Sequence, residues 1–240
     1  MTETEHDPNI AERIARFRTD TLEASGTWPA KRELAAALRE LLDCVCATDA
    51  SEAELQRAAD EIRATAHHFA SQPRMIDPAG VAEMALSGMA TFHDRSPIVG
   101  LSNPMAPPLD VLPDPETARV HGRGTFGSAY EGAPGCLHGG YVAAAFDEVL
   151  GMACIFSGHP GMTGELTIRY RRPTPIKTEL RFEGRFLRTE GRKIYTSGEV
   201  YAGDVLTAEA TGLFIAISRE KFEELSAERE RREGAPRGGQ

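Results

Sequence analysis

Cysteine is scarce in this chain of 240 residues, which contains four cysteines and no CxxC pair. None of the four has a histidine at the spacing of a zinc site, so the sequence predicts neither a metal centre nor a disulfide framework. We expect reduced thiols, buried or half-buried, as in a cytoplasmic protein. The four are Cys44, Cys46, Cys136 and Cys154.

Positive charge is also in deficit, with 27 Lys and Arg against 36 Asp and Glu and a net charge of -9. We therefore expect no nucleic-acid partner, because binding to phosphate backbones requires a positive face. The first residues lack the apolar stretch of a secretory signal, and no GxSxG motif marks a serine nucleophile elbow. The rest of the composition, 41% hydrophobic and 26% charged, is that of an ordinary globular protein.

The longest apolar stretch runs from Tyr141 to Phe156, where almost every residue is apolar on every face of a helix. Such a helix belongs in a protein core or in a membrane. This one falls short of the roughly 20 residues that a membrane span requires, and it holds Asp147 and Glu148 in its middle. The pattern predicts a central helix wrapped by the rest of the chain, and no membrane span.

Two amphipathic helices are predicted before residue 72. The first spans 30–45, and the second follows Ser51, which has capping-box spacing to Glu54. Their short connection favours an antiparallel pair, and we expect their apolar stripes to pack against the core domain. Residues 96–117 contain six prolines, which predicts an extended linker docked on a surface.

Strand patterns begin at Ala118 and recur after the apolar helix. Short turns separate the later candidates, so neighbouring strands should be antiparallel and should curl around the helix. The candidates lie at 163–170, 178–188, 193–201 and 205–217. The predicted α+β organisation has four parts: a helical extension (1–95), a linker (96–117), a sheet-and-helix domain (118–218) and a charged tail without fixed structure (219–240).

The segment from Gly122 to Gly127 matches the GxGxxG dinucleotide-binding pattern. That pattern binds a pyrophosphate only when a helix opens directly after it. Here a turn-like segment ending at Pro134 follows instead. We interpret the glycines as places where a strand bends or where another backbone approaches closely.

His138, Gly139 and Gly140 stand at the start of the apolar helix. Glycine amides at a helix N-terminus can stabilise an oxyanion, although glycines there can also serve only the helix entry. Asp147 is costly inside an apolar helix unless it is paired or functional. About 12 Å of helix separates it from Gly139, so one chain cannot bring both groups to one carbonyl. If they cooperate, two antiparallel central helices in a homodimer would bring them together.

Four cations form a further candidate set. Arginines at alternate strand positions, or at a hairpin, usually mark a solvated face, but they also bind phosphate well. The residues are Arg169, Arg171, Arg192 and Lys193.

These motifs, in this order, resemble the hotdog-fold acyl-CoA thioesterases. The set comprises His-Gly-Gly, the Asp that follows it, Met162-Thr163 before a strand ending in Arg-Tyr-Arg-Arg-Pro, and Glu-Gly-Arg-Lys. Tyr130–Gly135 is similar to a motif of one subgroup of the phenylacetate-pathway-type branch, which includes animal mitochondrial long-chain acyl-CoA thioesterases. The resemblance covers about residues 96–218 and implies a hotdog fold, a curled antiparallel sheet around one long helix.

The resemblance also implies a role for each motif residue. Asp147 would be the catalytic carboxylate and the Gly139 amide the oxyanion donor. Thr163 would help to place the nucleophile, and His138 would shape the helix start. Substrate contacts would fall on Gly140, Arg169, Arg171, Arg192 and Lys193. One position departs from the phenylacetate branch. Relatives in that branch have an Asn six residues before the His, and the residue at this position here is Gly132.

The predicted reaction is hydrolysis of an acyl-CoA to the free acid and CoA. Asp147 would act on water as general base or attack directly as nucleophile. No cofactor is implied, because coenzyme A is part of the substrate, and the implied assembly is a homodimer or a dimer of dimers. Three alternatives stay open: a hotdog dehydratase using His138, a thioesterase for carrier-protein thioesters, and an idle acyl-CoA binder whose N-terminal helices contact partners.

Overall fold

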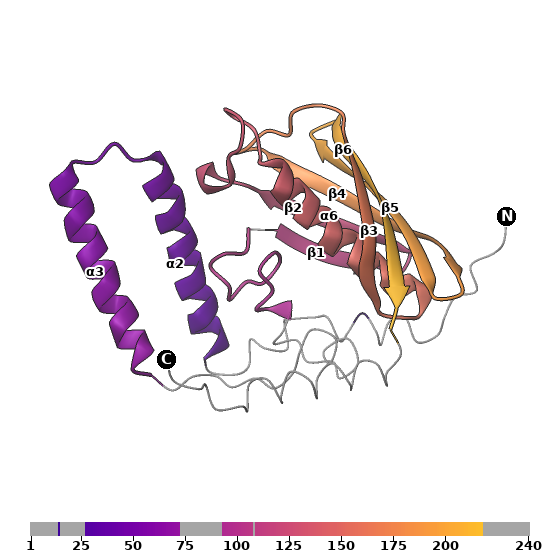
Figure 1. Ribbon diagram of the computed structural model, residues 1–240, viewed down its shortest axis with the longest axis horizontal. Helices are drawn as coiled ribbons and strands as arrows, with labels where there is room; N and C mark the ends of the chain where they lie inside the picture. The colour runs from indigo at the N-terminus through magenta and orange to yellow at the C-terminus, as the bar shows by residue number, and fades with distance from the viewer. Residues whose placement is uncertain (1–13, 15–26, 73–92, 108, 218–240) are drawn as a thin grey trace, which may run out of the picture.

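The computed structural model describes residues 14, 27–72, 93–107 and 109–217 (Figure 1). The predicted tail and most of the first 26 residues lie outside this part of the chain. Within it, one antiparallel sheet, one central helix and two N-terminal helices account for the architecture.

The sheet has six strands in the order β1-β2-β4-β5-β6-β3, and every neighbouring pair is antiparallel. The four strands predicted after the helix are confirmed to within two residues at each end. The strands are β1 (Leu109–Asp114), β2 (Arg119–Thr125), β3 (Gly161–Tyr170), β4 (Glu179–Glu190), β5 (Lys193–Ala202) and β6 (Val205–Ala216).

Helix α6 (Gly139–Ala153) lies across the concave side of this sheet, and the short 3-10 helix η3 (Cys154–Ser157) continues it (Figure 1). By length and composition, Gly139–Ser157 would also suffice to cross a membrane. In this structure the helix instead packs in the core, where it buries six side chains against the sheet. These are Val142, Ala145, Phe146, Val149, Leu150 and Ala153.

The glycines of the GxGxxG match serve this packing. Gly122 lies on β2, where an added Cβ would stand 3.0 Å from the Cβ of Phe182 and 3.3 Å from Val149 on α6. The element directly after β2 is the three-residue 3-10 helix η2 (Ser128–Tyr130), and α6 begins only at Gly139. The prediction that these glycines allow a close approach is confirmed at Gly122.

The predicted linker 96–117 contributes a strand to the sheet. In β1, Pro113 stands opposite Val120 of β2. The linker prediction is wrong for these residues, because proline is excluded from central strands but tolerated at an edge, and β1 is an edge strand. The sheet therefore begins at Leu109, nine residues before the predicted boundary at Ala118.

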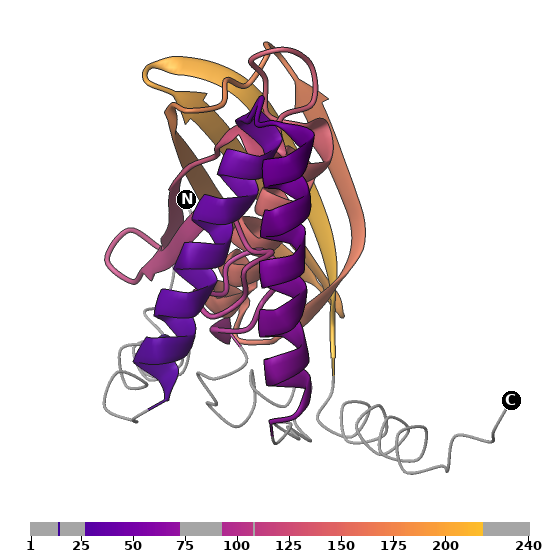
Figure 2. The same ribbon diagram turned by 90° about the vertical axis from the view of Figure 1, so that its left-hand side faces the viewer.

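The N-terminal helices are α2 (Trp28–Ala47) and α3 (Glu52–Ala70), which run side by side (Figure 2). The predicted capping box is present: the Ser51 side chain accepts from the Glu54 amide, and the Glu54 side chain accepts from the Ser51 amide. Packing against the core domain holds for α2, which buries Trp28 and Ala35. It is wrong for α3, which buries none of its residues.

Candidate active site

The N-terminus of α6 leaves one amide available. The Gly140 amide donates to Nδ1 of His138 at 3.0 Å, so the His138 side chain caps the helix. The amides of Tyr141 and Val142 both donate to the His138 carbonyl oxygen. Within the described residues, the Gly139 amide has no acceptor, which makes it the free donor of the first turn.

His138 is fixed from the preceding loop. Its own amide donates to the Tyr130 carbonyl at 3.0 Å, and the Tyr130 ring packs edge-on against Tyr141. The departure at Gly132 also has a physical reason. An added Cβ there would stand 2.8 Å from the Cα of His138, so an Asn cannot occupy this position without moving the helix entry.

Tyr170, at the end of β3, holds the same turn from the other side. Its hydroxyl donates to the Gly139 carbonyl oxygen at 2.8 Å, and its ring covers the space where a Gly139 side chain would lie. No role for Tyr170 follows from the sequence patterns described above. Simple alternation from Thr163 would place Tyr170 on the opposite face of the sheet from Thr163.

A β-bulge between Thr163 and Glu165 changes that alternation. Thr163 pairs with Phe214, a buried core residue, and Tyr170 pairs with buried Ala208, so both face α6. Arg169 pairs with Glu209 and faces away from the helix. One inserted residue thus brings Thr163 and Tyr170 to the same side of the sheet.

The structure brings two of the predicted site residues, Thr163 and Asp147, into contact. The Thr163 hydroxyl donates to Oδ1 of Asp147 at 2.7 Å, and no described residue donates to Oδ2. Asp147 is half-buried, in the middle of α6. Because Tyr170 contacts Gly139 and Thr163 contacts Asp147, the two halves of the candidate site lie at opposite ends of β3. A single chain does not bring them together.

The four predicted cations are not gathered at one place either. Arg171 donates to Glu209 at 2.6 Å and Arg169 lies 3.8 Å from the same carboxylate, on the face of the sheet turned away from α6. Arg192 lies at the β4–β5 hairpin and donates to the Ala216 carbonyl. Lys193 begins β5 beside it, at the end of the sheet where Thr163 lies.

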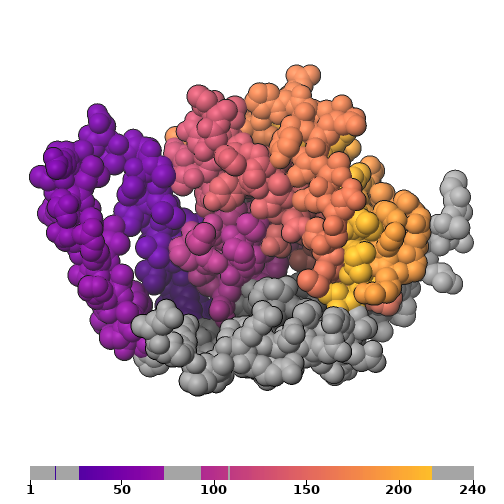
Figure 3. All heavy atoms as spheres, in the orientation of Figure 1, coloured from indigo at the N-terminus to yellow at the C-terminus, as the bar shows by residue number. Residues whose placement is uncertain are grey.

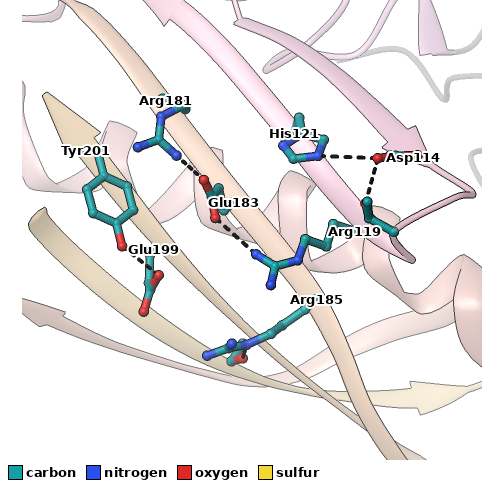
Figure 4. A network of polar contacts seen from close by, with 10 residues as sticks. Asp114, Arg119, His121, Arg181, Glu183, Arg185, Glu199 and Tyr201 are labelled. Carbon is teal, nitrogen blue, oxygen red and sulfur yellow. Dashed lines mark hydrogen bonds and ion pairs between the residues drawn. The ribbon is translucent and has the colours of Figure 1, made fainter. Parts of the chain in front are cut away.

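The outward face of the sheet carries a network of ion pairs (Figure 4). Glu183 accepts from Arg181 on its own strand and from Arg119 on β2, at 3.3 Å for Arg119. Arg181 also lies over the Tyr201 ring. Charges on this face are largely compensated by one another, so its arginines resemble the solvated face considered above more than a phosphate site.

A second carboxylate on α6 was not assigned by the sequence analysis. Glu148 accepts a hydrogen bond from the buried Ser96 hydroxyl at 3.1 Å, which ties α6 to the turn that begins at residue 93. Burial raises the pKa of Glu148, the Ser96 hydrogen bond opposes this, and the charge of Asp147 adds to it. Asp147 and Glu148 are neighbours in sequence but face different surroundings: Asp147 accepts from Thr163 of β3, and Glu148 accepts from the buried Ser96.

The thiol that follows Asp147 at the end of α6, Cys154, is a poor nucleophile. Cys154 is buried, and burial together with Asp147 raises the pKa of its thiol to about 12. Since the thiolate is the reactive form of cysteine, this raised pKa makes Cys154 unsuited to attack a substrate.

Comparison with known proteins decides the family. The crystal structure of protein RHA08564, a thioesterase superfamily protein, is 31% identical to this chain, with a TM-score of 0.67. The match covers 77% of this chain and 90% of that one. The chain belongs to the thioesterase superfamily. The thioesterase superfamily model itself matches residues 134–209, from the loop before His138 into β6.

Curated relatives of this thioesterase-superfamily chain are similar to it over a shorter stretch. Acyl-coenzyme A thioesterase THEM4 of Bos taurus is 39% identical over 97 residues, which is 40% of this chain and 40% of the relative. THEM4 of Xenopus laevis is 34% identical over 93 residues, 38% of this chain and 42% of the relative. The match thus spans about two fifths of the length of these relatives. The predicted family and the α+β hotdog fold are confirmed.

Proposed function

We propose that this protein hydrolyses acyl-CoA thioesters at a site shared between two copies of the chain. Three facts support the proposal. The chain belongs to the thioesterase superfamily, and it is similar to relatives named acyl-coenzyme A thioesterases. On α6, the Gly139 amide and Oδ2 of Asp147 have no hydrogen-bond partner among the described residues. The observation that carries it is Asp147 in the middle of α6, whose Oδ1 accepts from the Thr163 hydroxyl at 2.7 Å while no described residue donates to its Oδ2.

In the proposed reaction, the Gly139 amide donates to the thioester carbonyl oxygen and stabilises the oxyanion that forms there. One such donor is typically worth about 3 kcal/mol in the transition state. Asp147 takes a proton from water as the water oxygen bonds to the carbonyl carbon. The C–S bond then breaks, and the proton passes to the sulfur, so the products are a free acid and the CoA thiol. In the alternative mechanism, Asp147 attacks the carbonyl carbon directly, and the CoA thiol leaves to give an acyl anhydride. Water then hydrolyses the anhydride, so the products are the same.

The two groups act together only across a dimer, because about 12 Å of helix separates them. Strand β3 supplies a surface for such a pairing. It is one of the two edge strands of the sheet, its residues are mostly exposed, and Met162 is 54% exposed there. Pairing two β3 edges about a two-fold axis places the α6 helices antiparallel, so Gly139 of each copy faces Asp147 of the other.

We assign the CoA phosphates first to Arg192 and Lys193. Neither is ion-paired to an acid within the described part of the chain, and both lie at the Asp147 end of the sheet. Arg169 and Arg171 share Glu209, so their contribution requires them to release that carboxylate. Gly140, His138 and Thr163 complete the proposed site as neighbours of the reacting groups.

Hydrolysis of a panel of acyl-CoAs, followed by thiol release, tests the function. The Asp147→Asn variant should lose about 10²- to 10⁴-fold in kcat, which is the usual contribution of a general base. Asp204→Asn, at the exposed β5–β6 turn, is the matched control and should match the wild type. Binding of acyl-CoA without turnover by the wild type would identify an idle binder instead. Turnover unchanged in Asp147→Asn would remove Asp147 from the mechanism.

A further inference from the structure

Helix α2 is the N-terminal helix that lies against the core domain, and it contacts that domain at η2 (Figure 3). Asp43, near the C-terminal end of α2, directs Oδ1 at the backbone of η2. This oxygen accepts from the Ser128 amide and, at 3.3 Å, from the Ala129 amide. A side chain 85 residues before Ser128 in the sequence therefore holds the start of η2.

The residue directly before η2 cannot hold these amides itself. It is Gly127, which has no side chain to cap them, and the first amides of a helix need an acceptor. A larger residue has no room there, because an added Cβ would collide with Oδ1 of Asp43. The Asp43 carboxylate thus occupies the space that a side chain at position 127 would need.

From η2 the contacts continue to the first turn of α6. The last residue of η2 is Tyr130, whose carbonyl oxygen accepts from the His138 amide at 3.0 Å. The His138 side chain in turn accepts from the Gly140 amide at 3.0 Å. Gly139 lies between these two residues, and its amide has no acceptor among the described residues. A continuous path of hydrogen bonds therefore leads from Asp43 to both neighbours of Gly139.

The side chain of Tyr130 makes this path stiff. The residue is buried, and its ring packs edge-on against Phe126 and Tyr141, with ring centroids 5.7 Å and 4.9 Å away. Its hydroxyl donates to the Ala106 carbonyl oxygen at 3.3 Å. Because close-packed groups transmit displacement, a shift of η2 passes through Tyr130 to His138.

We propose that Asp43 is a positioning residue of the active site, which fixes the direction of the Gly139 amide through η2, Tyr130 and His138. This role rests on the proposed function, because the Gly139 amide takes part in the reaction only if it stabilises an oxyanion. Such a donor acts only when it points at the position that the oxyanion will occupy, so a small shift of the first turn of α6 costs rate. Helix α2, which lies outside the sheet-and-helix domain, thereby contributes to catalysis.

The test measures acyl-CoA hydrolysis by the wild type and three variants, at a temperature well below the melting temperature of each. Asp43→Ala removes the acceptor, whereas Asp43→Asn keeps a carbonyl oxygen that can cap the same amides. Ala35→Gly is the control for a general loosening of α2, because glycine weakens a helix interior. Ala35 is buried on α2 and lies about 12 Å of helix before Asp43, so this change removes no hydrogen bond to η2.

Asp43→Ala should lower kcat by about 10-fold and leave KM within about twofold, because the amide acts on the oxyanion and not on the bound substrate. The loss is smaller than the about 10²- to 10³-fold cost of removing an oxyanion donor, since the amide is displaced and not deleted. Asp43→Asn and Ala35→Gly should stay within about twofold of the wild-type kcat, because both keep an acceptor at η2.

Hydrogen exchange followed by mass spectrometry gives a second readout that does not depend on turnover. A peptide that contains the His138 and Gly140 amides should exchange faster in Asp43→Ala, and at the wild-type rate in the other two variants. Unchanged exchange in Asp43→Ala would overturn the inference. Equal kcat losses in Asp43→Ala and Ala35→Gly, or in Asp43→Ala and Asp43→Asn, would overturn it as well, because the acceptor oxygen at η2 would then not be the cause.

Failure of the proposed function would be visible separately. A wild type that releases no thiol from any acyl-CoA would refute acyl-CoA hydrolysis and leave the exchange comparison to decide on Asp43. Faster exchange at His138 and Gly140 in Asp43→Ala alone would still support its hold on the start of α6.

Discussion

At the scale of single residues, the candidate site depends on which face of β3 each side chain occupies. The bulge between Thr163 and Glu165 puts Thr163 and Tyr170 on the α6 side and sends Arg169 to the other. The bulge at Gly164 could not be predicted from the sequence, because it changes the register of the strand without changing its residue types.

The Thr163→Val variant should lower kcat by about 10- to 100-fold. A hydrogen bond to a charged group is worth about 1.5–3 kcal/mol, and this one orients the carboxylate that we propose reacts. Thr167→Val is the matched control on the outward face of the same strand, where the hydroxyl donates to Glu165. Steady-state hydrolysis of a single acyl-CoA is sufficient, and equal losses in the two variants would contradict the assigned role.

Tyr170→Phe should lower kcat by about fivefold, because it removes one neutral hydrogen bond worth about 1 kcal/mol and keeps the ring that covers Gly139. The control is Tyr201→Phe, which deletes a hydroxyl bonded to Glu199 on the opposite face of the sheet. Activity lost equally in both would point to a general effect on the sheet rather than on the first turn of α6.

Glu148 makes stability depend on pH. Its pKa lies above the ordinary value of 4.5 because it is buried, so the folded state favours the protonated form. The stabilising contribution is present below that value and is lost as pH rises. Relative to the wild type, Glu148→Gln should therefore gain thermal stability as pH increases from about 4 to about 8. Exposed Glu116→Gln should show no such trend, and a flat difference for Glu148→Gln would contradict its burial as a carboxyl.

At the scale of elements, α2 is fastened to the core by polar contacts as much as by apolar ones. Asp43 accepts from the amides of Ser128 and Ala129, and so caps the 3-10 helix η2. Arg32 donates to the buried Asp94 at 2.9 Å, and Arg39 donates to the Asn103 carbonyl at the same distance. Since η2 ends at Tyr130, whose carbonyl holds His138, the docking of α2 supports the start of α6.

Asp43→Ala should destabilise the protein by about 1 kcal/mol, the usual cost of losing a cap. For a chain of this size the melting temperature should fall by about 2–4 °C. Asp49→Ala, in the exposed α2–α3 connection, is the control and should melt like the wild type. A differential scanning measurement with unchanged melting for Asp43→Ala would show that α2 contributes nothing to the stability of the core.

Helices and strands with a strong hydrophobic periodicity could be predicted from the sequence, but the elements against which they pack were harder to predict. The apolar run at 141–156 and the alternation in β4 and β5 reflect burial within a few residues, and they predicted the helix and strands correctly. The role of 109–114 was missed because a proline at an edge strand reads locally like a linker. The apolar stripes of α2 and α3 were predicted from the sequence. An apolar stripe indicates that one face of a helix packs against something, but it does not identify the packing partner.

At the scale of the whole molecule, the shared site can be tested by mixing chains. Asp147→Asn lacks the acid, and Gly139→Val blocks the amide because even a Cβ there would stand 3.3 Å from the Tyr170 hydroxyl. Each variant alone should be inactive. When equal amounts are mixed and allowed to exchange, half of the dimers carry one intact site, so about a quarter of wild-type activity should return. No recovery, with exchange verified by mass, would contradict a site built from two chains.

The two edge strands of the sheet differ in how well they could pair with a strand of another chain. Strand β1 has six residues and includes Pro113, whereas β3 has ten residues and no proline. If two sheets pair through their β3 strands, the only edge strands left exposed are the two copies of β1. Because β1 contains a proline, it is a poor template for a further strand. If two copies join through β3 as proposed, strand-to-strand growth ends at the pair, and the same edge contact that builds the site also prevents extension into a filament.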